Sequence, residues 1–185
     1  MPETIDGTAF KKTSHLKKIL KKTKDGGLLL IVGGDFKNWK MNDIKHLSNI
    51  CFKDIDFSNS DWSGGRYEGI GFINSNLSGA NLSNVTMPHI LLRSTILENT
   101  NAKYADFSFG QLDGNWDASI ANWDLSQAKL KNFRFSCGNA ESNGCAFNRQ
   151  GVIITGADFS NATLINFACG TAIGRPQSWI MRLLP

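Results

Sequence analysis

Histidines and carboxylates are the side chains of this sequence with which general acid–base chemistry would begin. The histidines are His15 in a lysine-rich stretch, His46, and His89 directly after a proline, and none stands in a motif that pairs a nucleophile with a base. The carboxylates recur at regular positions in polar surroundings, which favours solvated sites over a dry cleft that would shift their pKa values. These carboxylates are Asp54, Asp56, Asp61, Glu68, Glu98 and Asp106. The sequence therefore predicts that the protein is not an enzyme, with no catalytic residue and no small-molecule substrate.

The cysteines predict neither a metal nor a cofactor. Cys51, Cys137, Cys145 and Cys169 show none of the close paired spacings of zinc sites. Cys137 and Cys145 flank a stretch of Gly, Asn and Ser and could form a disulfide, although a reduced protein is the default where no secretory signal is visible. The expected location is the cytoplasm, or outside the cell for an effector that is exported by a non-classical signal.

A large apolar residue recurs at every fifth position between residues 50 and 114, with only Ala102 departing from the series. The series is Phe52, Phe57, Trp62, Tyr67, Phe72, Leu77, Leu82, Met87, Leu92, Leu97, Ala102, Phe107 and Leu112. The residue two positions earlier is usually small, and the positions between are mostly polar. Helices repeat every 3.6 residues and strands every two, so neither could bury this series on one face. A stack of coils can bury it, if each short side of a coil points its central residue inward.

The repeated segments resemble the pentapeptide-repeat family. The stretches SNLSGANLSN (75–84) and GADFSNATLI (156–165) follow its motif of a small residue, Asp or Asn, Leu or Phe, and two variable positions. The resemblance implies an all-β fold, a right-handed four-sided β-helix with twenty residues per coil. Residues twenty apart should then stack, as in the column Phe52, Phe72, Leu92 and Leu112. Outward polar columns such as Asn81 and Asn101 could form side-chain ladders.

The N-terminal part differs in composition from the repeats. Residues 1–27 form a basic leader with two open interpretations. It is either a short amphipathic helix that could touch an anionic membrane weakly, or a solvated and partly mobile segment. Residues 28–49 are predicted to form an N-terminal cap and a first irregular coil, in which the strand 28–32 covers the open base. One register slip is expected near residues 44–47.

The predicted β-helix spans residues 50–171, and its register breaks after Leu112. The apolar series restarts three residues late at Ile120, where Trp123 and Phe133 occupy inward positions that are otherwise small. These two bulky residues are expected to widen or distort their coil. Residues 138–151 are predicted to form a loop at a corner. Residues 172–185 are predicted to form an apolar C-terminal cap.

Charge separates two possible functions of the coils. The best-known activity implied by the family resemblance is binding of type II topoisomerase (gyrase) through imitation of the DNA duplex, which protects the enzyme from toxins or drugs. A duplex as long as six stacked coils, ~29 Å, carries about seventeen negative charges. Residues 50–171 carry eight Lys and Arg against eleven Asp and Glu, a net charge of −3. The sequence therefore favours a non-enzymatic protein-interaction scaffold, as a bacterial effector or as a targeting or substrate-binding module of one, and the DNA mimic is the alternative.

Two groups of residues are candidates for contact with other molecules. The candidate interaction surface consists of outward residues of the repeats, namely Ile73, Leu91, Arg93, Ile96, Tyr104 and Phe109. The second group, with helical spacing, is Trp179, Ile180, Leu183 and Leu184. It predicts either a cap on the last coil or a contact that joins two molecules end to end. We expect a protein partner of unidentified nature, no nucleic acid, and a monomer or an end-to-end homodimer.

Overall fold

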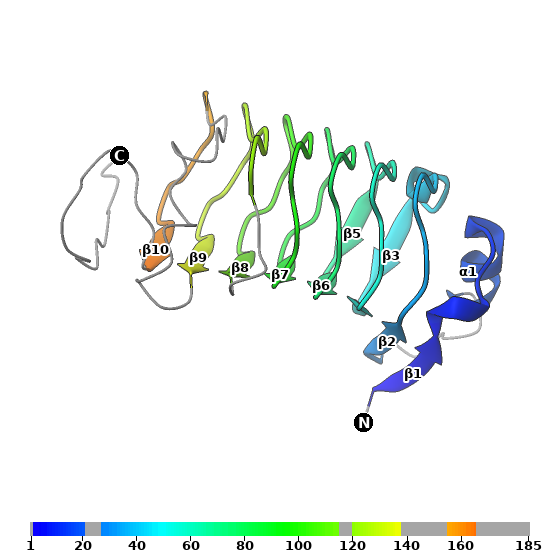
Figure 1. Ribbon diagram of the computed structural model, residues 1–185. Coiled ribbons are helices and arrows are strands. Elements are labelled where there is room, and N and C mark those ends of the chain that lie inside the picture. Colours follow the sequence, from blue (N-terminus) through cyan, green and yellow to red (C-terminus); the bar gives the residue numbers. More distant parts are fainter. Residues whose placement is uncertain (1, 21–26, 115–119, 138–154, 166–185) are drawn as a thin grey trace.

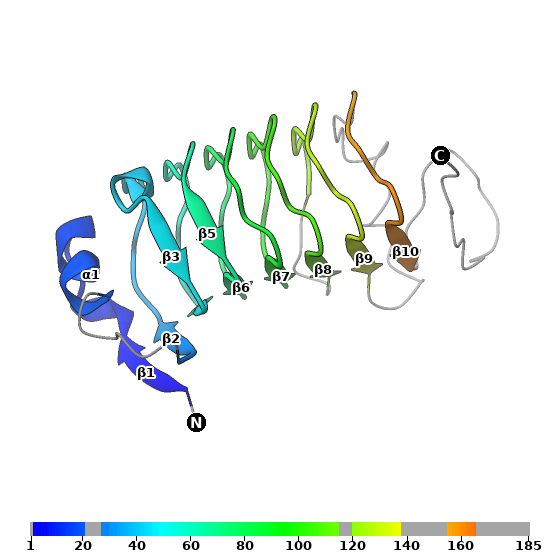
Figure 2. The same ribbon diagram turned by 180° about the vertical axis from the view of Figure 1, so that it is seen from behind.

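The computed structural model describes residues 2–20, 27–114, 120–137 and 155–165. Over these residues the chain forms a parallel β-solenoid with one short α-helix (Figure 1; Figure 2 from behind). The elements are β1 (Glu3–Asp6), the 3-10 turn η1 (Gly7–Ala9), α1 (Thr13–Leu20), β2 (Leu29–Val32), the 3-10 turn η2 (Met41–Asp43), β3 (His46–Ser48), β4 (Ile50–Lys53), β5 (Arg66–Glu68), β6 (Gly71–Ile73), β7 (Leu91–Arg93), β8 (Gln111–Gly114), β9 (Arg134–Cys137) and β10 (Thr163–Ile165). No helix in the described part of the chain is long and apolar enough to cross a membrane.

The main sheet runs along the whole solenoid, and its strands follow one another in chain order. The order is β1-β2-β4-β6-β7-β8-β9-β10, with every neighbouring pair parallel, and β3 pairs with β5 in a smaller sheet. Figure 1 shows the strands from β6 to β10 as a row of arrows along one side of the stack. Because the chain passes once round a coil between these strands, residues one coil apart become neighbours.

The fivefold apolar series forms the core. Phe52 lies opposite Phe72, Phe72 opposite Leu92, and Leu92 opposite Leu112, and all four side chains are buried. The rings of Phe52 and Phe72 stack with their centroids 5.7 Å apart. On the outside, the Asn101 Nδ2 donates to the Asn81 Oδ1 over 3.4 Å. The predicted inward column and the predicted outward ladder are therefore confirmed.

Tight turns separate the short sides of each coil, and each turn contains a residue with positive φ. From Asp54 to Phe109 such a residue occurs at every fifth position, and most are Asn or Gly. Glycine has no Cβ to clash in this left-handed conformation, and the short amide of Asn tolerates it better than other side chains do. Turns at this spacing are what a four-sided cross-section would require; the cross-section itself stays a prediction.

The register changes where the sequence predicts it. Lys40 bridges to Asp61, 21 positions later, whereas His46 pairs with Arg66, 20 positions later. The additional residue lies between Lys40 and His46, at or just after η2 (Met41–Asp43), which directly precedes the predicted region 44–47. Beyond β8 the offset becomes 23, as in the pair of Leu112 and Phe135, which confirms the three-residue delay. The predicted corner loop 138–151 lies wholly outside the described residues.

The bulky inward residues Trp123 and Phe133 are both fully buried without breaking the stack. A Cβ added to Gly110 in the preceding coil would lie 2.7 Å from the Phe133 Cε2, so Phe133 fills the space that this glycine leaves. The backbone hydrogen bond between the coils persists beside them, with the Phe107 N 2.9 Å from the Lys129 O. The expected distortion of this coil is therefore absent at the described hydrogen bonds. The small Gly110 in the preceding coil leaves the volume that the large Phe133 side chain occupies.

The N-terminal residues pack against the first coil rather than projecting into solvent. Residues 3–6 form β1, which pairs in parallel with β2, and Phe10 and Leu16 are buried in the same core as the repeats. Residues 13–20 form the helix α1, while the mobility of the leader and its contact with a membrane stay predictions. Strand 28–32 was expected to cover the base, but β2 lies inside the sheet between β1 and β4. The first coil is covered one layer further out, by β1 and α1 (Figure 2).

Candidate functional site

Six outward carboxylates of the coils are paired with basic side chains, mostly from a neighbouring coil, whereas Asp61, Glu68 and Glu98 are in none of the ion pairs of the described surface. Six such ion pairs lie on the described surface. They are Lys37–Asp56 (3.2 Å), Lys53–Asp54 (3.9 Å), Arg93–Asp113 (3.4 Å), Lys103–Asp124 (3.3 Å), Lys129–Asp106 (3.9 Å) and Lys131–Asp158 (3.4 Å). Exposed pairs of this kind stabilise a fold by only about 0–1 kcal/mol each. Their main consequence is that the acidic side chains are neutralised locally.

The environments of these carboxylates suit anions rather than catalytic acids. Partial burial acts to raise the pKa of Asp56, but hydrogen bonds from Ser58 and the nearby Lys37 outweigh it and lower the pKa. The same balance lowers the pKa of Asp124, where Ser126 and Lys103 outweigh partial burial. A general acid at neutral pH needs the opposite shift. These groups therefore remain ionised and structural.

The histidines and the described cysteine form no reactive constellation. His46 and His89 are exposed, and His15 is half-buried on α1. Burial raises the pKa of the Cys51 thiol, which disfavours the reactive thiolate. Among the described residues no group of His, Cys, Asp and Glu could hold a metal ion. The proposed pairing of Cys137 with Cys145 involves a residue outside the described part and stays a prediction.

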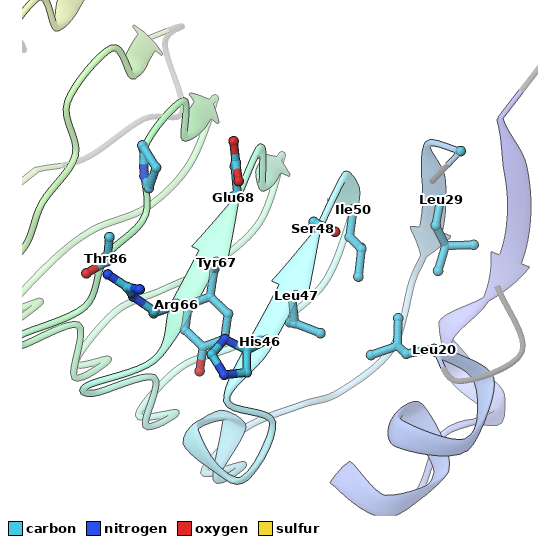
Figure 3. A pocket seen from close by; sticks show the side chains of 12 residues that line it. Leu20, Leu29, His46, Leu47, Ser48, Ile50, Arg66, Tyr67, Glu68 and Thr86 are labelled. Atoms are coloured by element: carbon cyan, nitrogen blue, oxygen red, sulfur yellow. The ribbon is translucent and has the colours of Figure 1, made fainter. Parts of the chain in front are cut away.

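A hollow of about 690 Å³ lies between the N-terminal cover and the sheet of β3 and β5 (Figure 3). The buried residues Leu29, Leu47 and Ile50 line it, with exposed polar side chains such as Arg66 at its rim. The sequence did not predict this hollow, since no motif marks its lining. Its border includes residues that flank the segment 21–26, which lies outside the description. We therefore assign no ligand to it.

The residues of the predicted interaction surface occupy several sides of the coils. Ile73 and Arg93 lie opposite each other in β6 and β7, and Leu91 belongs to β7 as well. Ile96 bridges to Asn76 on another side, beyond the next turn. Ile73, Leu91 and Ile96 are half-buried, so they offer little apolar area to a partner. The most exposed members of the predicted set are elsewhere.

Tyr104 and Phe109 are large apolar residues that project into solvent from two consecutive turns of the coil between β7 and β8. Their exposed fractions are 62% for Tyr104 and 56% for Phe109. The Phe109 ring stacks on the His89 imidazole of the preceding coil, with centroids 5.4 Å apart and planes inclined by 22°. Both rings therefore lie on the outer surface rather than in the core.

Both residues also stand in the left-handed backbone region, with φ 59° at Tyr104 and 63° at Phe109. A residue with a bulky side chain is strained there by about 1–3 kcal/mol. They are the only large apolar residues among the positive-φ positions of the described chain. Sequence reasoning named them as outward apolar residues but missed the strain. The signal was present, because the corresponding position of most other repeats is Asn or Gly.

The second candidate group, Trp179, Ile180, Leu183 and Leu184, lies outside the described residues. Its assignment as a C-terminal cap or as an end-to-end contact stays a prediction. The domain boundaries at residues 171 and 172 lie outside the description for the same reason.

The family model described as pentapeptide repeats matches residues 50–87 in eight copies. Among curated proteins, none matches this chain in sequence. The match covers the first part of the region in which the fivefold series is buried and the positive-φ turns recur every five residues.

Several solved structures are similar to the chain at low identity. A trypsin-treated variant of QnrB1, a plasmid-mediated fluoroquinolone resistance protein, has 19% identity and a TM-score of 0.45, with 75% of this chain and 73% of that chain covered. A pentapeptide-repeat protein from the Arabidopsis thaliana thylakoid lumen has 20% identity and a TM-score of 0.34, with 52% and 65% covered. HetL from the cyanobacterium Nostoc, involved in regulation of heterocyst differentiation, has 18% identity and a TM-score of 0.25, with 74% and 72% covered. Residues 50–87 thus match pentapeptide repeats in eight copies, and they form part of the parallel solenoid.

Proposed function

We propose that this protein is a non-enzymatic protein-interaction scaffold, acting as a bacterial effector or as a targeting or substrate-binding module of one. The observation that carries the proposal is the pairing of outward carboxylates with lysine and arginine along the stack. It supports a surface for neutral protein contact rather than one for chemistry or for imitation of a polyanion. The exposed rings of Tyr104 and Phe109 add apolar area of the kind found at protein contacts.

The alternative, a DNA mimic that protects gyrase, requires a dense row of unpaired negative charges. Duplex DNA carries one such charge per about 1.7 Å of its length. In this chain Asp56, Asp124 and Asp158 each have a lysine Nζ within 3.4 Å. The lysine therefore compensates the negative charge of each carboxylate on the surface that a partner would contact. The net charge of −3 over residues 50–171 points in the same direction.

We expect the purified protein neither to inhibit DNA supercoiling by gyrase nor to relieve a gyrase poison at micromolar concentration. The reason is that the compensated surface lacks the charge density that would displace DNA from a basic groove. A supercoiling assay on agarose gels, run with and without a fluoroquinolone, measures both effects. A variant with glutamine at Lys103, Lys129 and Lys131 serves as the matched comparison, because it exposes three carboxylates without changing the coil.

Inhibition or protection by the unmodified protein would reject the scaffold proposal in favour of the DNA mimic. If only the glutamine variant inhibited gyrase, the scaffold proposal would be supported, because the result would show that the three lysines prevent the unmodified protein from imitating DNA. Inactivity of both proteins would also support it.

A further inference from the structure

Building on the proposed function, we propose that Tyr104 and Phe109 form the principal contact with the partner, and that this partner is a folded protein whose apolar pockets receive the two rings. The rings project from consecutive turns of one coil, five residues apart in the chain. The binding face would be centred on the turns at residues 104 and 109 rather than on the half-buried side that carries Ile73 and Leu91.

The backbone conformation indicates that the two rings serve something other than the fold. At the same turns of the preceding coil the chain has Asn84, which tolerates positive φ far better than tyrosine, and His89. Both rings remain more than half exposed, so their burial contributes little to the core in return, and the packing of Phe109 is its stacking on the His89 imidazole at the surface. Residues whose backbone strain is not offset by stabilising packing contacts are characteristic of functional sites.

The turns that carry the rings are held firmly by the adjacent coil. The Tyr104 N donates to the Ser126 O over 3.0 Å, and the Phe109 N donates to the Lys131 O over 2.8 Å. Because the backbone is fixed before binding, little conformational entropy is lost when a partner docks. Rigid aromatic anchors of this kind dominate the affinity of many protein interfaces.

The charges beside the rings argue for a protein rather than a nucleic acid. Single-stranded nucleic acids also stack on exposed aromatic rings, but they need unpaired cations along the same path. Lys103, Lys129 and Lys131 are close to the two turns in the chain or in the next coil, and each has an aspartate partner within 3.9 Å. We therefore expect the contact between the two rings and the partner to be mainly apolar, with an affinity that depends only weakly on salt concentration.

The first experiment measures strain in the isolated protein. Replacing Tyr104 with asparagine (Tyr104→Asn) should raise Tm by about 2–4 °C, because the left-handed turn is relieved. The reverse exchange at the same turn of the preceding coil, Asn84→Tyr, should lower Tm by a similar amount. An unchanged or lowered Tm for Tyr104→Asn would mean that the ring serves the fold, and the inference would fail while the scaffold proposal stood.

The second experiment measures binding with a phage-displayed library of small folded domains as the probe. Domains selected on the unmodified protein should lose affinity at least about tenfold for the double variant Tyr104→Asn/Phe109→Asn and keep it for the control Asn84→Ser. Their affinity should change less than about threefold between low and high salt. Selected domains that bind the double variant equally well, or that a single-stranded oligonucleotide displaces, would overturn the inference alone. Failure to select any domain would count against the scaffold proposal as well.

Discussion

Replacing Leu82 with lysine is expected to abolish folding of the solenoid. Leu82 is fully buried in the fivefold series, with a turn of the coil on either side of it. An ammonium group placed there has no acidic partner and no water, which would cost on the order of 5 kcal/mol or more. That loss equals the whole stability of a marginal domain, about 5–15 kcal/mol. Circular dichroism and thermal melting of the purified variant would measure the effect, with aggregation in the cell as the expected first sign.

The adjacent exchange Asn81→Lys is the matched control for this prediction. Asn81 points outward, and its Oδ1 accepts a hydrogen bond of 3.1 Å from the Ser83 N. Losing that bond should lower stability by about 1 kcal/mol. A lysine at this position could also pair with Asp61, which already contacts the Asn81 Nδ2. Similar melting curves for Leu82→Lys and Asn81→Lys would show that the fivefold inward assignment is incorrect.

A single methyl group at Gly65 is expected to destabilise the protein strongly. The added Cβ of Gly65→Ala would lie 2.1 Å from the Tyr67 Cζ, far inside van der Waals contact. The Tyr67 ring is buried, and its hydroxyl donates to the Met41 O over 3.2 Å, so it has no free direction in which to move. Burial also raises the pKa of the Tyr67 hydroxyl, which keeps it a neutral donor. Overpacking and the loss of this buried hydrogen bond together should cost roughly 2–5 kcal/mol, or about 5–15 °C in Tm.

The double variant Gly65→Ala/Tyr67→Leu distinguishes this clash from a general intolerance of the coil. Tyr67→Leu alone should destabilise, because it leaves a cavity and removes the hydrogen bond to Met41. In the double variant the alanine has room, so its added cost should largely disappear. A double-mutant cycle by chemical denaturation measures this coupling. Additive losses would mean that the two sites do not share the same space.

Spacing was sufficient to predict the parts of the fold that depend on repetition. The column from Phe52 to Leu112 and the late restart at Ile120 follow from counting residues, because stacked coils bury whatever recurs at the coil period. The N-terminal cover was not predictable in this way. The strand at residues 3–6 carries no repeat, and its pairing with β2 depends on a free sheet edge that exists only after the coils have formed.

The candidate site was predicted by residue type but not by backbone conformation. Tyr104 and Phe109 were identified as outward apolar residues, together with residues such as Ile73 that are half-buried. Their significance comes from the positive φ of the turns, which a single repeat does not reveal. Likewise, the glycine at position 65 is just another small residue in the pattern until the neighbouring Tyr67 ring occupies its space. These properties arise from contacts within or between coils, not from periodicity.

The short and nearly constant offset between paired residues of the coils has a consequence for how the chain reaches this structure. Partners such as Phe52 and Phe72 are 20 positions apart, and even after the insertions Lys129 and Asp158 are separated by only 29. The entropy lost in closing each loop is therefore nearly the same for every coil, whatever the length of the stack. Folding can begin at any one coil and advance to its neighbours, and unfolding can retreat inward from the ends. Amide protons of β6 and β7 should exchange with solvent more slowly than those of β1, which makes the middle of the stack the last part to lose its structure.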